Sequence, residues 1–265
     1  MNKKSFSVVI ITIFVLAAII SIFYEHKVNN KDENLNNKEI KTTTVTGTRE
    51  KKKEEKIMDG ISINFHASIR IEKVGKVFYF DPYKIEDSKN DADYIFVTHS
   101  HYDHYSEEDI KKVMNDKTKF VVTSDLEENI KGLGVSSDNI TVVFPEKKYK
   151  VDDISFSTVS SYNIEKTYHK KSYNWVGYVV TIDNNKYYVV GDSDVTDELK
   201  NTECDVIFIP VGGTYTMNAK EAADVVNNMN VKYAVPIHYG VVGSKSDAES
   251  FVSSLNDNIK GIILK

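Results

Sequence analysis

The sequence contains little cysteine, proline or tryptophan: one Cys, four Pro and one Trp in 265 residues. The single thiol, Cys204, cannot form an intramolecular disulfide, so a disulfide framework is excluded. The sequence has no cysteine near position 20, which excludes a lipidated anchor there. It also has no G-x-S-x-G motif, which removes one serine-based hydrolytic mechanism.

Positive charge is not in excess. The formal net charge is −5 and the pI is about 5.8, so nonspecific nucleic-acid binding is not expected. The run Arg49–Lys56 is rich in lysine, but its charges alternate in sign. We therefore interpret this run as a solvated spacer.

The N-terminus is predicted to be a transmembrane signal anchor over residues 1–24. Ser5–Tyr24 is apolar apart from Ser and Thr, and twenty residues at 1.5 Å each span about 30 Å, one hydrocarbon core. A cleaved signal peptide is the alternative, but Ile19–Phe23 offers no small-x-small cleavage site. Lys3 and Lys4 favour a cytoplasmic N-terminus. This predicts a single-pass protein of the cell membrane with an extracytoplasmic domain.

The following segment, residues 25–59, is predicted to be a disordered charged linker. It is rich in Asn, Lys, Glu and Thr and has few large apolar residues, so it cannot bury enough surface to offset chain entropy. Residues 60–265 then form one globular domain, long enough for a substantial core.

The domain is predicted to alternate between strand-rich blocks and helices. Two β-rich blocks, each finished with helices, indicate two sheets packed face to face with helices outside. Asn218 and Glu221 are expected to cap a helix as a pair. The predicted strands are 61–65, 68–73, 76–80, 94–98, 119–123, 140–144, 148–151, 154–160, 176–183, 186–190, 205–210, 232–237 and 260–264, and the predicted helices are 106–115, 125–131, 218–229 and 244–255.

Three of the seven histidines lie within six residues, His99-Ser-His101-Tyr-Asp103-His104. This stretch follows an apolar, β-branched run, so it lies where a buried strand ends. Residues two apart in extended chain point the same way, so His99 and His101 can reach one metal ion. After the chain turns, Asp103 and His104 can face a second ion. A solvated polar loop is the alternative, and the density of ligand-type residues disfavours it.

The run Thr98–His104 resembles the T-H-x-H-x-D-H signature of the metallo-β-lactamase superfamily. Phe80-Asp81-Pro82, Val190-Gly191-Asp192-Ser193 and Pro236-Ile237-His238-Tyr239-Gly240 match further marks of that superfamily in the same order. Short marks such as Phe65–Ser68 also resemble the metal-dependent hydrolase branch that includes ascorbate-6-phosphate lactonase. The resemblance implies a mixed α+β and α/β fold of four layers, an αβ/βα sandwich, here preceded by one N-terminal transmembrane helix.

The resemblance also implies a site for two divalent metal ions, zinc first, with manganese or iron as alternatives. Asp192 matches the carboxylate that bridges both ions, and His238 matches the last ligand. Asp81 matches an aspartate that orients a ligand histidine through a hydrogen bond. The expected ligands are therefore His99, His101, Asp103, His104, Asp192 and His238.

One ligand of the superfamily is missing from its usual place. The middle strand ends at Ser160-Ser161-Tyr162-Asn163, where a third histidine for the first ion is expected. Either His169 loops back as this ligand, or the first ion has weaker ligation. The same segment could instead bind substrate, through Tyr162, Asn163, Lys170 and Lys171. His66 is expected to be either a buried structural residue or a residue beside the metal ligands.

These residues predict a membrane-anchored metal-dependent hydrolase. A hydroxide shared by two ions would attack an ester, lactone or phosphodiester bond, and Asp103, the expected catalytic residue, would orient it or shuttle its proton. The anchor favours a lipid-derived substrate alongside small molecules. The alternative is a non-catalytic metal-holding module that binds partners at the membrane surface.

Overall fold

The computed structural model describes residues 56–264. The predicted anchor over 1–24 and most of the predicted linker over 25–59 lie outside the described residues. Residues 56–58, near the end of the predicted linker, are helical. Among the residues that are described, no helix is long and apolar enough to span a membrane. A compact unit begins at Gly60.

The first half of the domain forms a six-stranded sheet. Its strands lie in chain order, β1-β2-β3-β4-β5-β6. β1, β2 and β3 pair antiparallel, whereas β3 through β6 pair in parallel. The strands are β1 (Ile61–Phe65), β2 (Ser68–Lys73), β3 (Lys76–Phe80), β4 (Tyr94–Phe96), β5 (Lys119–Thr123) and β6 (Ile140–Val143).

The second half forms a seven-stranded sheet in the order β13-β12-β11-β10-β9-β8-β7. β7 to β10 pair antiparallel, and β10 to β13 pair in parallel. The strands are β7 (Lys148–Val151), β8 (Ile154–Ser160), β9 (Val176–Ile182), β10 (Asn185–Val189), β11 (Val206–Pro210), β12 (Tyr233–Ile237) and β13 (Lys260–Gly261).

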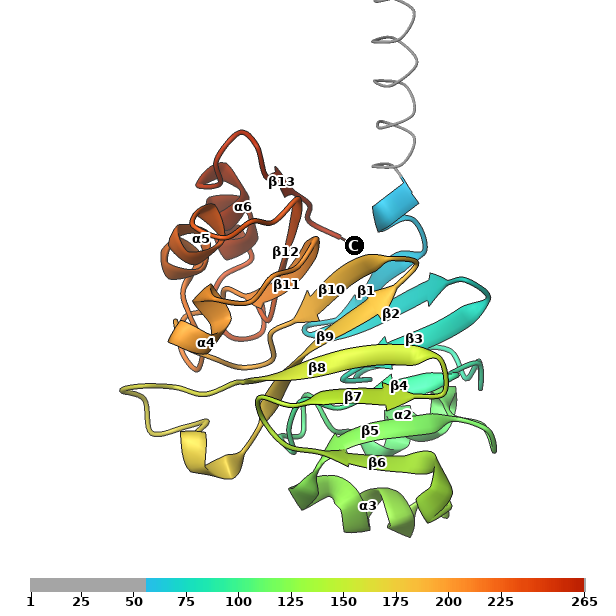
Figure 1. Ribbon diagram of the computed structural model, residues 1–265. Helices are drawn as coiled ribbons and strands as arrows, with labels where there is room; N and C mark the ends of the chain where they lie inside the picture. Colours follow the sequence, from blue (N-terminus) through green and yellow to red (C-terminus); the bar gives the residue numbers. More distant parts are fainter. Residues whose placement is uncertain (1–55, 265) are drawn as a thin grey trace, which may run out of the picture. The chain divides into compact units, whose positions relative to one another are not determined.

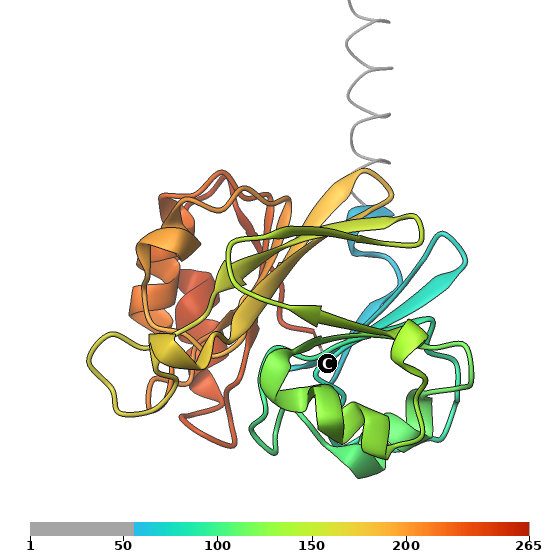
Figure 2. The same ribbon diagram turned by 60° about the horizontal axis from the view of Figure 1, so that its bottom comes forward.

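Helices cover the outer face of each sheet (Figures 1 and 2). The predicted helix over 125–131 divides into a 3₁₀ turn and α3, and the short helix α4 was not predicted. Asn218 and Glu221 form the predicted capping box at the start of α5. The α-helices are α2 (Glu107–Val113), α3 (Glu127–Gly132), α4 (Asp197–Lys200), α5 (Ala219–Asn227) and α6 (Ser246–Ser253), and the 3₁₀ turns are η1 (Ser124–Leu126), η2 (Ser137–Asn139) and η3 (Lys171–Tyr173).

Aromatic side chains fill the space between the two sheets. Phe96 of β4 meets Phe156 of β8 edge-on at 5.3 Å between ring centroids, and Tyr178 of β9 at 5.1 Å. The buried Tyr178 hydroxyl donates to the carbonyl of Val97 at 2.8 Å. This contact crosses from the second sheet to the segment that carries the clustered histidines.

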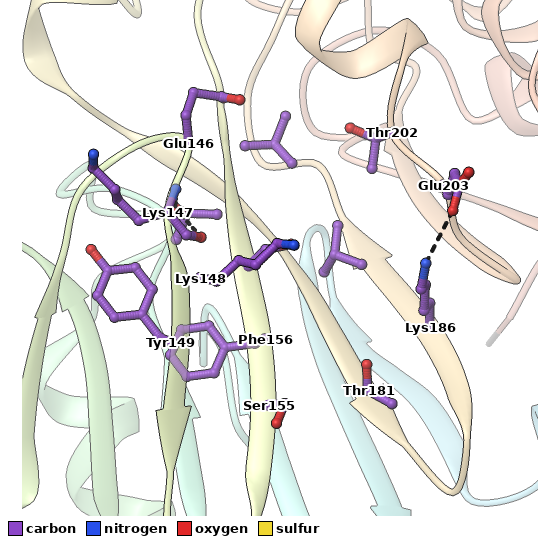
Figure 3. Close-up of a pocket in the computed structure, with 14 residues that line it drawn as sticks. Glu146, Lys147, Lys148, Tyr149, Ser155, Phe156, Thr181, Lys186, Thr202 and Glu203 are labelled. Atoms are coloured by element: carbon purple, nitrogen blue, oxygen red, sulfur yellow. Dashed lines mark hydrogen bonds and ion pairs between the residues drawn. The ribbon is translucent and has the colours of Figure 1, made fainter.

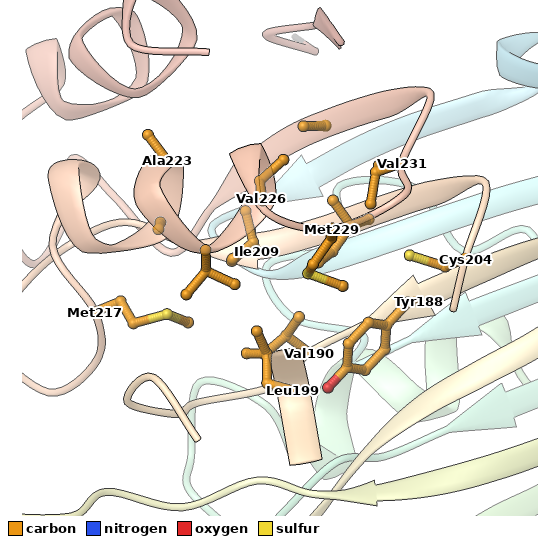
Figure 4. Close-up of a cluster of buried hydrophobic side chains, with 14 of the residues drawn as sticks. Tyr188, Val190, Leu199, Cys204, Ile209, Met217, Ala223, Val226, Met229 and Val231 are labelled. Carbon is orange, nitrogen blue, oxygen red and sulfur yellow. The ribbon is translucent and has the colours of Figure 1, made fainter. Parts of the chain in front are cut away.

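A separate cluster joins the second sheet to its helices. Figure 4 shows side chains such as Ile209, Val226 and Met229 meeting between β11 and α5. Cys204 belongs to this cluster, and burial raises the pKa of its thiol to about 12. The thiol is therefore protonated at neutral pH, packs as an apolar group and is not a reactive nucleophile.

The four layers, helix, sheet, sheet and helix, confirm the predicted sandwich. Every predicted strand is present, with its ends moved by at most three residues. The ends of β4, β10 and β12 lead directly into the clustered histidines, Asp192 and His238. The fold thereby places the predicted ligands on loops that leave two different sheets.

Candidate metal centre

The segment after β4 is fixed by one buried carboxylate. Asp81, which follows β3 with φ 47°, accepts hydrogen bonds from the backbone N–H and the hydroxyl of Thr98, each at 2.7 Å. Its Oδ2 also lies 2.7 Å from Nδ1 of His104. This leaves Nε2 of His104 to face the site. The geometry matches the orienting role that the resemblance implied for Asp81.

Three histidines form the first ligand group: His99, His101 and His169. Their ligand nitrogens all lie within 4.8 Å of one another, and Nε2 of His169 is 3.1 Å from Nδ1 of His101. The indole of Trp175 packs against this group, with its ring centroid 4.8 Å from those of His99 and His101. His169 thus loops back to His99 and His101, and its role as the third ligand stays a prediction.

Asn163 supports His169 rather than taking its place. The backbone N–H of Asn163 donates to the carbonyl of His169 at 2.8 Å, and the two side chains contact at 3.2 Å. The amide also donates to the backbone carbonyl of Tyr215 at 2.7 Å. Asn163 therefore closes the loop that carries the histidine.

Asp192 lies between the ligand groups. Its Oδ2 is 3.2 Å from Nε2 of His169 and 3.0 Å from Nε2 of His238, while Oδ1 is 3.3 Å from Nε2 of His104. The preceding Gly191 has φ 71°, and a Cβ there would lie 3.2 Å from the Cβ of Thr98. A glycine thus permits the close approach that brings Asp192 to the histidines.

A second ligand group contains His66, Asp103 and His238, whose ligand atoms also lie within 4.8 Å of one another. Oδ2 of Asp103 is 3.5 Å from Nε2 of His66 and 3.6 Å from Nε2 of His238. Both histidines have positive φ, 55° and 57°, and the N–H of His238 donates to the carbonyl of His66 at 3.1 Å. His66 therefore lies at the site itself, closer than sequence reasoning alone placed it.

Several buried nitrogens in these groups have no hydrogen-bond partner. Buried polar atoms are normally paired, so unpaired imidazole nitrogens converging on carboxylates form a donor set that fits divalent metal ions. The unpaired nitrogens are Nδ1 and Nε2 of His66, Nε2 of His99, Nε2 of His104, and Nδ1 and Nε2 of His238.

Burial and charge act in opposite directions on the ionisable groups. Burial lowers the pKa of His99 and of His101, which favours the neutral imidazole that binds metals. Burial alone would raise the pKa of Asp192, but the charges of His238 and His104 outweigh it and lower that pKa well below its usual range. Asp192 is therefore an anion at neutral pH.

The remaining carboxylate of the second group behaves in the same way. Burial would raise the pKa of Asp103, but contacts with His238 and His66 lower it well below its usual range. Burial likewise disfavours a charged His238, yet the charge of Asp192 and the contact with Asp103 raise its pKa to about 9. Protons and metal ions thus compete for the His238 nitrogen.

A cavity of about 210 Å³ opens over these groups. The four residues predicted to bind substrate are absent from its lining, and their substrate-binding role stays a prediction. The Tyr162 hydroxyl and the Lys171 ammonium both bond to Glu198 of α4, Asn163 holds His169, and Lys170 is exposed outside the cavity. The cavity is lined by His101, Tyr102, Asp103, Tyr168, His169, Asp192, Tyr215, His238 and Val242.

A larger cavity, of about 620 Å³, lies elsewhere on the second sheet. Figure 3 shows side chains of β7 and β8 around it, with Lys186 and Glu203 joined at 3.2 Å across one side. Its lining residues include none of the histidines that make up the ligand groups. The chemistry therefore belongs to the smaller cavity.

The profile of the β-lactamase superfamily domain matches residues 61–238. The chain belongs to this family, and the metallo-β-lactamase resemblance of Thr98–His104 is confirmed. The narrower resemblance to the ascorbate-6-phosphate lactonase branch stays a prediction.

Relatives and solved structures agree on the fold. A UPF0173 metal-dependent hydrolase of Pyrococcus abyssi is 29% identical over 218 residues, which are 76% of this chain and 93% of the relative. Isothiocyanate hydrolase from Delia radicum gut bacteria is 16% identical, with a TM-score of 0.61 over 77% of this chain and 95% of that one. CmlA, a diiron β-hydroxylase from Streptomyces venezuelae, is 12% identical, with a TM-score of 0.61 over 77% of this chain and 52% of its own.

Proposed function

We propose that this protein is a metal-dependent hydrolase that uses two divalent ions. The observation that carries the proposal is the position of Asp192, whose carboxylate lies 3.2 Å from His169 of the first ligand group and 3.0 Å from His238 of the second, and which also forms a group with His99 and His104. The first ion would be held by His99, His101 and His169, and the second by Asp103, His104 and His238. Asp192 would contribute to both sites, and His66 lies close enough to add to the second.

The family relatives support this activity. The Pyrococcus abyssi relative is named a metal-dependent hydrolase, and it is similar to this chain over nearly its whole length. The buried, unpaired imidazole nitrogens are the ligands that zinc prefers, and they also suit manganese and iron. Zinc is our first choice, because a hydrolytic reaction needs no redox change at the metal.

Bound divalent ions would lower the pKa of a coordinated water to about 7 and polarise the bond to be broken. The chain itself supplies a carboxylate beside that position. Asp103 lines the cavity, with its Oδ2 3.5 Å from Nε2 of His66 and 3.6 Å from Nε2 of His238, where the anion can orient a nucleophile or pass on its proton. Asp81 fixes His104, and Asn163 fixes His169, so the ligands are oriented before an ion arrives.

The substrate carries an ester, lactone or phosphodiester bond and is a small molecule or a lipid-derived compound. The apolar run Ser5–Tyr24 anchors the protein in the cell membrane as a single pass, and the charged linker holds the domain on the extracytoplasmic side. This arrangement gives the site access to compounds at the outer surface of that membrane. The acidic net charge supports a site without nucleic-acid partners.

Metal analysis combined with a substrate panel tests the proposal. The full chain, loaded with zinc or manganese at neutral pH, should carry a stoichiometric metal complement and hydrolyse p-nitrophenyl esters or bis(p-nitrophenyl) phosphate. Asp192→Ala should lower both metal content and hydrolysis, since two ions lose a shared anionic ligand and repel each other more. Asp197→Ala, an exposed carboxylate on α4, is the matched control and should change neither.

Two outcomes would contradict parts of this proposal. A domain that holds no divalent ion after loading would contradict the proposed metal-dependent hydrolase activity. Stoichiometric metal without turnover on any substrate would favour a metal-holding module that binds partners. Protease added to intact cells tests the topology separately, because an extracytoplasmic domain should be digested without lysis.

A further inference from the structure

Exposed apolar side chains gather at the mouth of the metal-centre cavity. Two of the most exposed large hydrophobic residues, Tyr102 at 72% and Tyr168 at 51%, line the cavity directly. Val241, 55% exposed, precedes the lining residue Val242. These residues come from three separate loops. Clustered exposed apolar groups around a cavity mark a surface that meets a ligand.

One wall of this mouth is built from two tyrosines. The rings of Tyr168 and Tyr215 pack edge to face, with centroids 4.8 Å apart and planes at 81°. The backbone carbonyl of Tyr215 accepts the hydrogen bond from Asn163, the residue that also holds His169. The aromatic wall and the first ligand group are therefore held by the same side chain, at a fixed distance from each other.

Another part of the mouth belongs to the histidine segment itself. Tyr102 lies between His101 and Asp103 in sequence, and its ring packs edge-on against Tyr83 at 6.1 Å. Most of its surface remains open to solvent. A large ring in this position loses little freedom when a ligand covers it, so its burial would contribute to binding.

The rest of the lining consists of candidate metal ligands, which are imidazoles and carboxylates. Besides Tyr102, Tyr168, Tyr215 and Val242, every lining residue belongs to the two ligand groups or is Asp192. Two nearby lysines already have carboxylate partners: Lys166 pairs with Asp194, and Lys171 pairs with Glu198. Within residues 56–264, the cavity lining includes neither Lys nor Arg to receive a phosphate.

We propose that this aromatic mouth binds the apolar acyl or aryl part of an uncharged carboxylic ester or lactone. The proposal rests on the hydrolase function above and narrows its substrate class. In the reaction, water adds to the acyl carbon, the bond from that carbon to the ester oxygen breaks, and one proton passes to the departing oxygen. Tyr102, Tyr168 and Tyr215 would determine specificity by covering the apolar group while the ligand groups face the carbonyl.

The test compares esters of rising chain length on the metal-loaded full chain. The values of kcat/KM should rise from p-nitrophenyl acetate to p-nitrophenyl butyrate, and both should exceed the value for bis(p-nitrophenyl) phosphate. A rise that stops at butyrate would assign the substrate to small free esters, and a rise that continues to octanoate would assign it to lipid-derived esters. Either result supports an apolar-binding mouth.

Two tyrosine variants and one control complete the test. Tyr168→Ala and Tyr102→Ala should raise KM for p-nitrophenyl butyrate about tenfold, with little change in kcat, because they remove binding shared by substrate and transition state. Phe144→Ala removes another exposed ring, 47% exposed and outside the cavity lining, and should leave KM unchanged. Thermal unfolding and metal content of each variant should match the unmodified chain, which separates lost binding from lost folding.

The inference and the function fail in different ways. One contrary result is that the protein hydrolyses the phosphodiester better than every ester, with kinetics that the tyrosine variants do not change. That result would contradict the binding role of the aromatic mouth but would remain compatible with the proposed hydrolase activity. A metal-loaded chain that hydrolyses neither class would overturn the hydrolase itself.

Discussion

Asn163 and His169 are joined at both their backbones and their side chains. The N–H of Asn163 donates to the carbonyl of His169 at 2.8 Å, and the amide contacts the imidazole at 3.2 Å. The five residues between them form a closed loop that returns the histidine to the metal centre. An asparagine just after the middle strand thus holds a candidate ligand that lies six residues later.

This relationship predicts different metal losses for the two residues. His169→Ala should deplete about one ion per chain, because the first group loses one of its three imidazoles. Asn163→Ala should keep both ions at saturating metal but weaken the first site about 10–100-fold, as loss of an orienting hydrogen bond does. Competition with a chromophoric chelator measures both values. Equal metal content and affinity in the two variants and the unmodified chain would show that His169 is not a ligand.

Asp81 should act on the second site in a similar way. Asp81→Asn keeps the size of the side chain but removes the anion that holds Nδ1 of His104 at 2.7 Å. Metal affinity is expected to fall about 10–100-fold. Asp91→Asn, which breaks a carboxylate contact with Arg70 away from the site, is the control and should leave affinity unchanged. A normal metal affinity in Asp81→Asn would exclude the orienting role.

The single tryptophan offers a direct optical report on the first group. Trp175 is the only Trp in the sequence, and its ring lies 4.8 Å from those of His99 and His101. Cobalt(II) bound by these histidines should quench its fluorescence strongly, with a stoichiometric break in the titration. His101→Ala should weaken cobalt binding, so that a higher cobalt concentration is needed to quench the fluorescence. If the emission of the unmodified chain does not respond to saturating cobalt, then the first group does not hold that ion.

Asp109 should make stability depend on pH away from the metal centre. This carboxylate accepts from the N–H groups of Lys84 and Ile85, each at 2.9 Å, and from the Lys112 ammonium at 3.0 Å. Burial raises its pKa, but the contacts with Ser106 and Lys112 and the two N–H groups outweigh burial and lower it. Asp109→Asn should therefore cost about 1–3 kcal/mol of unfolding free energy at pH 7.

The direction of the pH effect follows from the lowered pKa. Because the folded carboxyl has a lower pKa than the unfolded one, its contribution is complete above the unfolded value near 4 and is lost as pH falls through the folded value. Urea unfolding should be measured at pH 7 and at several pH values below about 4. The difference in unfolding free energy between Asp109→Asn and the unmodified chain should shrink as the pH falls. A gap that stays constant with pH would show that the charge of Asp109 contributes nothing.

Local patterns made the strands and most candidate ligands predictable. Alternating and β-branched runs predicted β1 to β3, β7 and β8 with their observed ends, since buried strands need those side chains. The dense cluster from His99 to His104 required no knowledge of distant contacts. These features depend only on neighbours along the chain.

The features that sequence reasoning missed depend on contacts between distant segments. The four-residue helix α4 is too short to show a period, and it supplies Glu198, which takes the Tyr162 hydroxyl and the Lys171 ammonium away from the cavity. The sequence names His66 as a candidate but leaves its role open, because the residue is isolated there, and only the folded chain places its ring 3.8 Å from that of His238. The close approach of Gly191 to Thr98 also depends on two segments that are distant in the sequence.

The candidate ligands follow strands of both sheets, and this has a consequence for the lifetime of the folded protein. The first sheet supplies His99, His101, Asp103 and His104, and the second supplies His169, Asp192 and His238. An ion held by residues of both sheets would fasten the two halves of the sandwich together, contributing about 2.7 kcal/mol when the free ion is at 100 times its Kd. A shortage of metal would then weaken the packing of the two sheets and expose the aromatic side chains between them, such as Phe96 and Tyr178. The amount of the protein in a cell would follow the metal supply, even where no substrate is present.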